Sequence, residues 1–211
     1  MRSLTRFFSE QARTPRGLFG RFFMSRVFDR GNLPLNRFVE QTLALNGHEQ
    51  LLEIGYGTGL LIAALARQLT TGAIHGIDLS ETMAAIAKKK NRSSIRGGKV
   101  TLDQGDFNTV PPSDPYDGNR FDAVFTVNTI YFWPEPQRTL AGIHRVLKPG
   151  GRLIIGFHDN AYLKKQGVDR DIFTYYTVGD VSDLLSKTFK SVDIRVEKGE
   201  NAPCYCAVAF K

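Results

Sequence analysis

The chain has 211 residues, 42% hydrophobic and 23% charged, a composition typical of one globular domain with a continuous core. Its apolar runs, such as residues 153–157, are far shorter than the roughly 20 residues of a membrane-spanning helix, which argues against an integral membrane protein. One residue separates Cys204 from Cys206, a poor spacing for a disulfide, so we expect alternate positions on one strand. So few cysteines indicate a reducing, cytoplasmic compartment.

The net charge of +7 is concentrated at one end of the chain. Residues 1–38 hold eight arginines and no lysine against two acidic residues, which leaves +6. Such a segment is attracted to polyanions, either nucleic acid or an anionic membrane. The richness of residues 1–17 in Arg, Ser and Thr is also found in organellar presequences. A second basic cluster, residues 88–99, lies where we expect a helix to end, and cations there complement the helix dipole.

Short β-rich runs alternate with helical ones from residue 50 onward. Strands are predicted at Gln50–Ile54 and Ala73–Asp78, and helices at 58–69 and 80–91, the second capped by Ser80. These segments make two complete βα units. The alternation predicts parallel strands joined by crossover helices.

The second half of the chain continues the alternation. The expected elements are strands at Val100–Gln104 and Phe121–Val127, a helix at 135–147, a strand at 151–157, a helix at 178–189, and a final hairpin of 192–196 with Cys204–Phe210. Pro149 and Gly150 are expected to stop the first of these helices. Thr177 and Asp180 have the spacing of a capping box at the start of the second.

These elements predict an α/β fold: a doubly wound, Rossmann-like α/β/α sandwich with a mainly parallel sheet and a C-terminal antiparallel hairpin. Residues 1–38 are expected to form a basic, phenylalanine-rich helical cap on a ligand-binding domain of residues 39–211. Ligands of such sheets bind beyond the carboxyl ends of the strands. The residues that follow each strand are therefore the candidates for chemistry.

A glycine-rich loop follows the first strand, with the sequence Glu53-Ile-Gly55-Tyr-Gly57-Thr-Gly59. Glycine lets the backbone approach a ligand closely, although the same pattern also serves as a tight turn into a helix. Asp78 ends the second strand nineteen residues after Gly59. A carboxylate at that place accepts hydrogen bonds from both hydroxyls of a ribose. The two signals together predict a nucleoside cofactor.

The spacing also indicates which nucleoside. The dinucleotide fingerprint requires G-x-G-x-x-G, and Leu60 occupies its last glycine position here. Glu53, two residues before Gly55, suits a ligand with an ammonium group better than one with phosphates. S-adenosylmethionine fits this description better than NAD does.

Five motifs extend this interpretation, and they read LLEIGYGTG, GIDLS, QGDF, FDAVFTVN and RVLKPGGRL. Over about residues 51–153 the chain resembles the class I S-adenosylmethionine-dependent methyltransferases of the small bacterial type. The resemblance implies a seven-stranded sheet that ends in an antiparallel hairpin. It implies S-adenosylmethionine as cofactor, S-adenosylhomocysteine as product, and no metal.

The resemblance also implies a role for each matching residue. The methionine moiety would lie against Glu53, Gly55, Gly57 and Gly59, and Asp78 would hold the ribose. Around the adenine, Leu79 would border the ring, Asp106 would face its amino group, and Phe107 would pack on the ring edge. Asn128 would lie beneath the methyl-bearing end. Residues 128–131 read N-T-I-Y, where nucleic-acid amino-methyltransferases of this fold have N-P-P-Y. Residues 132–134 form either an aromatic lip over the pocket or part of the core.

Methyl transfer from a sulfonium is an in-line displacement, so alignment of the reactants supplies most of the catalysis. A base is needed only when the acceptor must lose a proton. His158 and Tyr131, which follow the fifth and fourth strands, are the candidate catalytic residues. The segment 160–176 is the candidate lid.

The acceptor is less defined. The chain leaves no room for a separate target-recognition domain, which argues against sequence-specific DNA methylation and favours a small-molecule or amphiphilic acceptor. The alternatives are an RNA-associated methyltransferase or a non-catalytic S-adenosylmethionine-binding protein that uses the basic arm, and, more remotely, an oxidoreductase. Phe19, Phe22, Phe23 and Val27 recur at helical spacing, so the cap either packs on the core or rests on an anionic membrane surface. A peripheral, cytoplasmic location follows from the second case.

Overall fold

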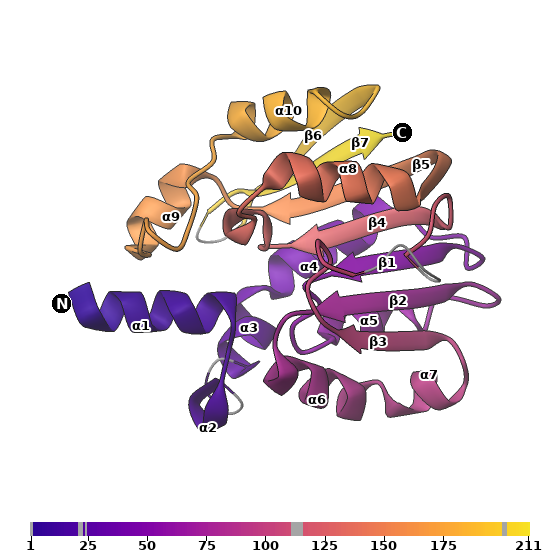
Figure 1. Ribbon diagram of the computed structural model, residues 1–211, viewed down its shortest axis with the longest axis horizontal. Helices are drawn as coiled ribbons and strands as arrows, with labels where there is room; N and C mark the ends of the chain where they lie inside the picture. Colours follow the sequence, from indigo (N-terminus) through magenta and orange to yellow (C-terminus); the bar gives the residue numbers. More distant parts are fainter. Residues whose placement is uncertain (1, 21–22, 24, 111–115, 200–201) are drawn as a thin grey trace.

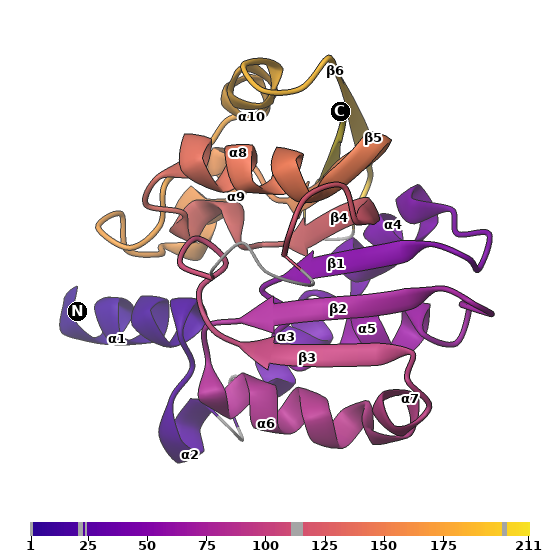
Figure 2. The same ribbon diagram turned by 45° about the vertical axis from the view of Figure 1, so that its right-hand side comes forward.

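The computed structural model describes residues 2–20, 23, 25–110, 116–199 and 202–211. Its described strands form a seven-stranded sheet in the order β3-β2-β1-β4-β5-β7-β6, with helices packed around it (Figures 1 and 2). Strands β1 to β5 pair in parallel, whereas β7 runs antiparallel to both β5 and β6. The predicted doubly wound fold with a C-terminal hairpin is confirmed.

The strands lie close to their predicted positions. They are β1 (Gln50–Ile54), β2 (Ala73–Asp78), β3 (Val100–Gln104), β4 (Phe121–Val127), β5 (Leu147–Phe157), β6 (Ser191–Glu197) and β7 (Cys204–Phe210). The prediction that Pro149 and Gly150 stop a helix is wrong, because helix α8 (Pro136–Val146) ends earlier and both residues belong to β5. A shift in the β4–β5 register, from Phe121↔Leu147 to Ala123↔Arg152, accommodates this irregular stretch.

The helices include several that the sequence pattern does not predict. They are α1 (Arg2–Arg13), α2 (Gly17–Phe19), α3 (Ser25–Gly31), α4 (Leu33–Leu43), α5 (Leu60–Leu65), α6 (Glu81–Lys90), α7 (Arg92–Arg96), the 3-10 helix η2 (Ile130–Phe132), α8, α9 (Asn160–Gln166) and α10 (Val178–Ser186). Ser80 caps α6 by accepting a hydrogen bond from the Met83 amide, as predicted. The Thr177–Asp180 capping box of α10 is also confirmed. Helix α5 begins later than predicted because Gly59 before it has a φ of +69°, and it also ends earlier, at Leu65.

Two apolar cores lie on the two faces of the sheet. Helices α4, α5 and α6 contribute buried side chains to one core, and α8, α9 and α10 contribute to the other. Cys204 and Cys206 are both free and buried at alternate positions of β7, as expected. Because residues two apart on a strand share a face, both thiols join the same core.

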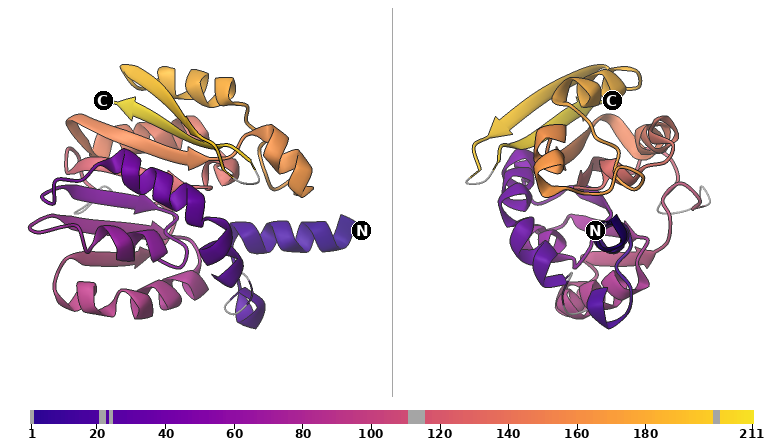
Figure 3. Two further views of the ribbon diagram at one scale, coloured as in Figure 1. Left: turned by 180° about the vertical axis from the view of Figure 1, so that it is seen from behind. Right: turned by 90° about the vertical axis from the view of Figure 1, so that its left-hand side faces the viewer.

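The N-terminal helices α1, α2 and α3 lie beyond the carboxyl edge of the parallel strands, and α1 projects away from the sheet (Figures 1 and 3). Helix α4 spans residue 38, and its Leu35, Val39 and Leu43 are fully buried against the sheet. We therefore use "the cap" for α1 to α3, residues 2–31. The predicted helical face through residues 19–27 is divided between α2 and α3, and Phe22 lies outside the described residues.

Among the described residues, no helix combines the length and hydrophobicity that a bilayer crossing requires.

Gly76 on β2 tests how tightly the sheet is packed. A Cβ there would lie 2.7 Å from Tyr56 Cδ1 and 2.9 Å from both Ile62 Cδ1 and Leu102 Cδ2. Gly76→Ala is therefore expected to lower the free energy of unfolding by roughly 1 to 3 kcal/mol in urea denaturation. Gly31→Ala is the matched control, because its Cβ would meet nothing within 4 Å. Equal stability of the two variants would contradict the packing described here.

Candidate functional site

A cavity of about 530 Å³ lies at the carboxyl ends of the parallel strands, within the size range of small-molecule sites. Ten of the predicted site residues line it: Glu53, Gly55, Gly57, Asp78, Leu79, Asp106, Phe107, Asn128, Tyr131 and His158. Each follows or ends one of the five neighbouring strands β3, β2, β1, β4 and β5. The topology therefore gathers residues from distant parts of the sequence at one edge of the sheet.

The glycine loop after β1 forms the floor of this cavity. Gly55 has a φ of +76°, and a Cβ on it would lie 2.5 Å from Thr129 Cγ2. Gly57 has a φ of +52°, but a Cβ there would meet nothing within 4 Å. The loop thus needs glycine conformations, and at Gly57 the backbone is open to a ligand.

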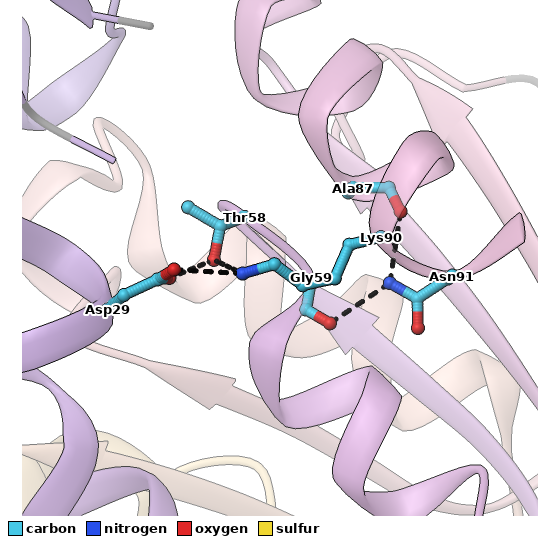
Figure 4. Close-up of polar contacts among 6 residues, drawn as sticks. All are labelled: Asp29, Thr58, Gly59, Ala87, Lys90 and Asn91. Atoms are coloured by element: carbon cyan, nitrogen blue, oxygen red, sulfur yellow. Dashed lines mark hydrogen bonds and ion pairs between the residues drawn. The ribbon is translucent and has the colours of Figure 1, made fainter. Parts of the chain in front are cut away.

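Gly59 has a different role from the other two glycines. It is not among the residues that line the cavity, and a Cβ on it would lie 2.6 Å from Asn91 Nδ2. That amide nitrogen donates hydrogen bonds to the carbonyl oxygens of Gly59 and Ala87, each at 3.0 Å (Figure 4). The last glycine therefore allows close packing against α6.

Two buried carboxylates flank the loop. Asp78 accepts hydrogen bonds from the Gly57 amide at 2.7 Å and the Ser80 amide at 2.8 Å, and burial raises its pKa against the effect of these bonds. Glu53 is only 3% exposed, and its Oε2 has no hydrogen-bond partner in the described protein. Burial raises the pKa of Glu53 well above its ordinary value, and the negative charge of Asp78 adds to this effect.

An uncompensated buried carboxylate is costly, so this part of the cavity is complementary to hydrogen-bond donors and positive charge. S-adenosylmethionine supplies both, through its ammonium group, its sulfonium and its ribose hydroxyls. A dinucleotide would instead bring a pyrophosphate towards two acids. The residues present fit the predicted cofactor.

The predicted adenine-binding residues lie on the β2–β3 side of the cavity. The half-buried Asp106 accepts a hydrogen bond on Oδ1 from the Asn108 amide at 2.9 Å. Phe107 is 9% exposed and packs edge-on against Tyr116. Leu79 is an apolar side chain with 45% exposure at the cavity wall. These positions offer a polar acceptor and two apolar surfaces, as a purine requires.

Asn128 and Tyr131 lie beyond β4. Asn128 has a φ of +55°, a strained conformation for a residue other than glycine, and its Nδ2 donates a hydrogen bond to Asn32 Oδ1 at 3.1 Å. The Tyr131 hydroxyl accepts from the His158 amide at 2.6 Å and donates to the His158 carbonyl at 2.8 Å. Burial raises the pKa of Tyr131 and keeps the hydroxyl protonated. This geometry favours a positioning role for Tyr131 over the predicted catalytic one.

His158, at the end of β5, has the surroundings of a neutral base. Its Nδ1 lies 3.0 Å from the Pro203 carbonyl oxygen, and its ring packs on Tyr162 with 4.2 Å between centroids. A carbonyl only accepts hydrogen bonds, so Nδ1 carries the proton in this arrangement and Nε2 has the free lone pair. Burial lowers the pKa of His158, which favours the neutral imidazole near pH 7.

Aromatic side chains line the cavity that also contains His158, and most of them were not predicted as site residues. They are Phe8, Phe23, Phe132, Trp133, Tyr162 and Phe173. Trp133 both lines the cavity and belongs to a core, so the two interpretations of residues 132–134 hold together. The remaining aromatics come from the cap and from the 160–176 segment, and only their position in the fold reveals them.

Hydrogen bonds hold the cap over the cavity. The Thr58 hydroxyl of the glycine loop donates to the Asp29 carboxylate of α3, and Lys90 Nζ lies 2.9 Å from the same carboxylate (Figure 4). Farther along, the Ser80 hydroxyl donates to the Pro15 carbonyl at 2.6 Å. The cap is thus attached directly to the loop that faces the cofactor.

Comparisons with known proteins agree with this site. A family model described as a methyltransferase domain matches residues 52–155. The uncharacterized methyltransferase YdaC of Bacillus subtilis is 26% identical over 184 residues, which cover 85% of this chain and 93% of that protein. The ubiquinone/menaquinone biosynthesis C-methyltransferase UbiE of a Geobacter species is 28% identical over 154 residues, 70% of this chain and 64% of that protein. A SAM-dependent methyltransferase structure from Aquifex aeolicus shares the fold, with a TM-score of 0.67, 22% identity, and coverage of 88% and 95% of the two chains.

The doubly wound sheet, the glycine loop and the two buried acids define a class I S-adenosylmethionine-dependent enzyme. The chain belongs to the methyltransferase-domain family, and S-adenosylmethionine is its cofactor.

Asp78→Ala tests the ribose-binding side of the cavity. Loss of this carboxylate is expected to weaken S-adenosylhomocysteine binding by roughly 1.5 to 3 kcal/mol in calorimetry, because the ribose hydroxyls lose a charged acceptor. Asp122→Ala is the control, because that carboxylate also accepts a backbone hydrogen bond, from Gln50 at 2.8 Å, but at the opposite end of β1. Unchanged affinity in Asp78→Ala would remove this residue from the site.

Asp106→Asn tests adenine recognition. The new side chain retains the bond from the Asn108 amide through its oxygen and places an amide nitrogen, a donor, where Asp106 has its second acceptor. The dissociation constant of S-adenosylhomocysteine is expected to rise about tenfold, equivalent to about 1.4 kcal/mol. Asp117→Asn is the control, because Asp117 makes a similar local bond to the Gly118 amide at 2.8 Å. Equal affinities, with matching circular dichroism, would exclude this role for Asp106.

Proposed function

We propose that this enzyme methylates a small apolar acceptor, ring-bearing or lipid-like, that carries an ionisable hydroxyl group. The observation that supports this most is the aromatic lining of the cavity beside a neutral histidine. Aromatic walls bind apolar rings and chains and exclude water. The similarity to a methyltransferase named for ubiquinone and menaquinone biosynthesis supports the same class, because quinones are apolar rings with lipid tails.

The cofactor half of the proposed mechanism uses the acids and the glycine loop. When bound, S-adenosylmethionine supplies an electrophilic methyl group, and its demethylated product is S-adenosylhomocysteine. Glu53 and Asp78 would hold the ammonium and ribose groups, and Asp106 would accept from the adenine. Gly57 leaves the space that the ligand occupies. Asn128, fixed by Asn32, would lie beneath the methyl-bearing end.

The acceptor half uses His158 and the aromatic wall. His158 Nε2 would take the proton of the acceptor hydroxyl. The acceptor oxygen would then receive the methyl group that the cofactor supplies, with the carbon–sulfur bond broken and S-adenosylhomocysteine left as the thioether. The Pro203 carbonyl stabilises the resulting imidazolium through Nδ1–H. Phe132 and Phe173, whose rings pack 4.5 Å apart, hold the acceptor in line and keep water out.

His158→Ala is expected to lower kcat by roughly 10²- to 10⁴-fold and to leave cofactor affinity unchanged, because a positioned base contributes about this much. The wild-type rate is expected to fall only below pH 6.5, the ordinary histidine value, because burial lowers the pKa and the base is neutral above it. Assays from pH 5 to 9 measure both effects.

The control for that experiment is His48→Ala, an exposed histidine at the amino end of β1 that hydrogen-bonds Thr71. If the His158→Ala enzyme is as active as this control across the pH range, the enzyme uses no base and acts only by aligning the reactants.

A second experiment compares acceptors by measuring transfer of a labelled methyl group to phenols, quinols, phospholipids and RNA. Preferred transfer to RNA would overturn the small-molecule proposal in favour of the RNA-associated alternative.

A further inference from the structure

We propose that the exposed apolar side of the cap docks this enzyme onto an anionic lipid bilayer and that the acceptor enters the cavity from that surface. The binding surface consists of Leu4, Phe7, Phe8, Phe23 and Val27, and we call it the docking face. The entry of the acceptor rests on the proposed function, whereas the docking itself does not.

The docking face contains most of the large apolar side chains that are exposed to solvent in the described part of this molecule. Six of the eight exposed large apolar side chains among the described residues lie between residues 4 and 33. Leu4 is 63% exposed, Phe23 49% and Phe7 41%. A contiguous apolar surface of this kind on an enzyme marks an interaction site.

The cap phenylalanines whose side chains the structure describes pack on one another and not on the sheet. Phe7, Phe8, Phe19 and Phe23 form a chain of ring contacts with centroids 4.9 to 6.3 Å apart. None of the four is part of the two apolar cores. On α1 the buried residue is Ser9, which accepts a hydrogen bond from the Asp169 amide at 2.9 Å, whereas Leu4, Phe7 and Phe8 share another side of the helix. The amphipathic helix therefore turns its apolar side outward.

The charge of the cap complements an anionic surface. All six arginines of residues 4–38 whose side chains the structure describes are exposed: Arg6, Arg13, Arg16, Arg26, Arg30 and Arg37. Both acidic residues of this segment are already in ion pairs, Glu10 with Arg6 and Asp29 with Lys90. Exposed arginines beside exposed phenylalanines are the composition of an interfacial helix on anionic lipid.

A second, smaller hollow also combines arginines with apolar side chains. It has a volume of about 430 Å³, and its described lining consists of Phe23, Arg26, Val27 and Arg30. Two guanidinium groups beside two apolar side chains match an anionic head group attached to acyl chains. The exposed aliphatic side chains Leu4 and Val27 favour lipid over RNA, because bases stack on aromatic side chains, whereas acyl chains also pack on aliphatic ones.

The docking face is continuous with the active-site cavity. Phe8, Phe23 and Val27 are exposed on the outside and also line the cavity. A view along α1 places the cap directly over the carboxyl edge of the sheet (Figure 3). An apolar acceptor that leaves the bilayer at this face therefore reaches the aromatic wall beside His158 without crossing water.

Sedimentation of the full chain with vesicles tests the docking. Wild type is expected to bind vesicles of phosphatidylcholine with phosphatidylserine, but not phosphatidylcholine alone, and to dissociate at high salt. Leu4→Ser/Phe7→Ser, neither of which lines the cavity, is expected to weaken binding at least tenfold. Arg26→Gln/Arg30→Gln is expected to weaken it about thirtyfold at low salt.

Matched controls separate docking from general loss of charge or surface. Val196→Ser removes an apolar side chain that is 62% exposed on β6, and Arg92→Gln/Arg96→Gln removes two exposed cations from α7. Both controls are expected to bind vesicles as wild type does, and all variants should keep the wild-type melting temperature and cofactor affinity.

Absence of vesicle binding, binding to neutral vesicles that salt does not weaken, or equal losses in the controls would overturn the docking. So would retention of RNA by a protein that ignores lipid. Because sedimentation needs no acceptor, a failure of the proposed methylation, seen as an inert His158 substitution, is distinguishable from a failure of docking.

Discussion

Two carboxylates withdrawn from water, on Glu53 and Asp78, impose the constraint on which the rest of the site depends. They end adjacent parallel strands, and each approaches the same loop. Asp78 is compensated by the amides of Gly57 and Ser80, whereas one oxygen of Glu53 has no partner in the described protein. Burial of an isolated charge is costly, which is why the pKa of Glu53 is raised well above its ordinary value. The empty site therefore favours the neutral acid, and a positively charged ligand would favour the carboxylate.

The same constraint explains why glycine occurs where it does. A side chain at Gly55 would strike Thr129, and a side chain at Gly57 would enter the space above the acids. The loop therefore comes close enough for its amide to reach Asp78 without closing the cavity. Beyond it, strands β4 and β5 add Asn128 and His158, so the acids lie on the β1–β3 side of the sheet and the histidine lies on the β4–β5 side.

The sequence predicted the elements whose signal is local. The carboxyl ends of β1 to β5, the caps at Ser80 and Thr177, and the glycine loop all depend on residues within a few positions of one another, and all are confirmed. The partners of the site residues were not predictable in this way. Pro203, which fixes the imidazole of His158, lies 45 residues away, and the Asn32 partner of Asn128 is 96 residues away. The packing of α6 against Gly59 was not predictable either, because the glycine pattern of the loop does not show which helix lies beside it.

The sequence also gave no decision between core and surface for the N-terminal phenylalanines. Helical periodicity reports that a helix has an apolar side but not what covers it. The ring contacts within the cap, and the hydrogen bond to Ser9 on α1, leave Leu4, Phe7 and Phe8 exposed. Helix α4, two residues after α3, is also amphipathic, and its apolar side is buried. The two helices differ in where the fold places them: α4 packs on the sheet, whereas α1 extends beyond its carboxyl edge (Figure 1).

The contacts between Asp29, Thr58 and Lys90 connect the cap with the loop at the cavity. Thr58 belongs to the loop that surrounds the cofactor, and Asp29 belongs to the helix through which the cap reaches the rest of the molecule. Any movement that lifts the cap removes a contact from the loop, and any ligand that orders the loop strengthens the hold on the cap. Such linkage is reciprocal by thermodynamic necessity. A ligand whose binding depends on the position of Thr58 would therefore also depend on the position of the cap.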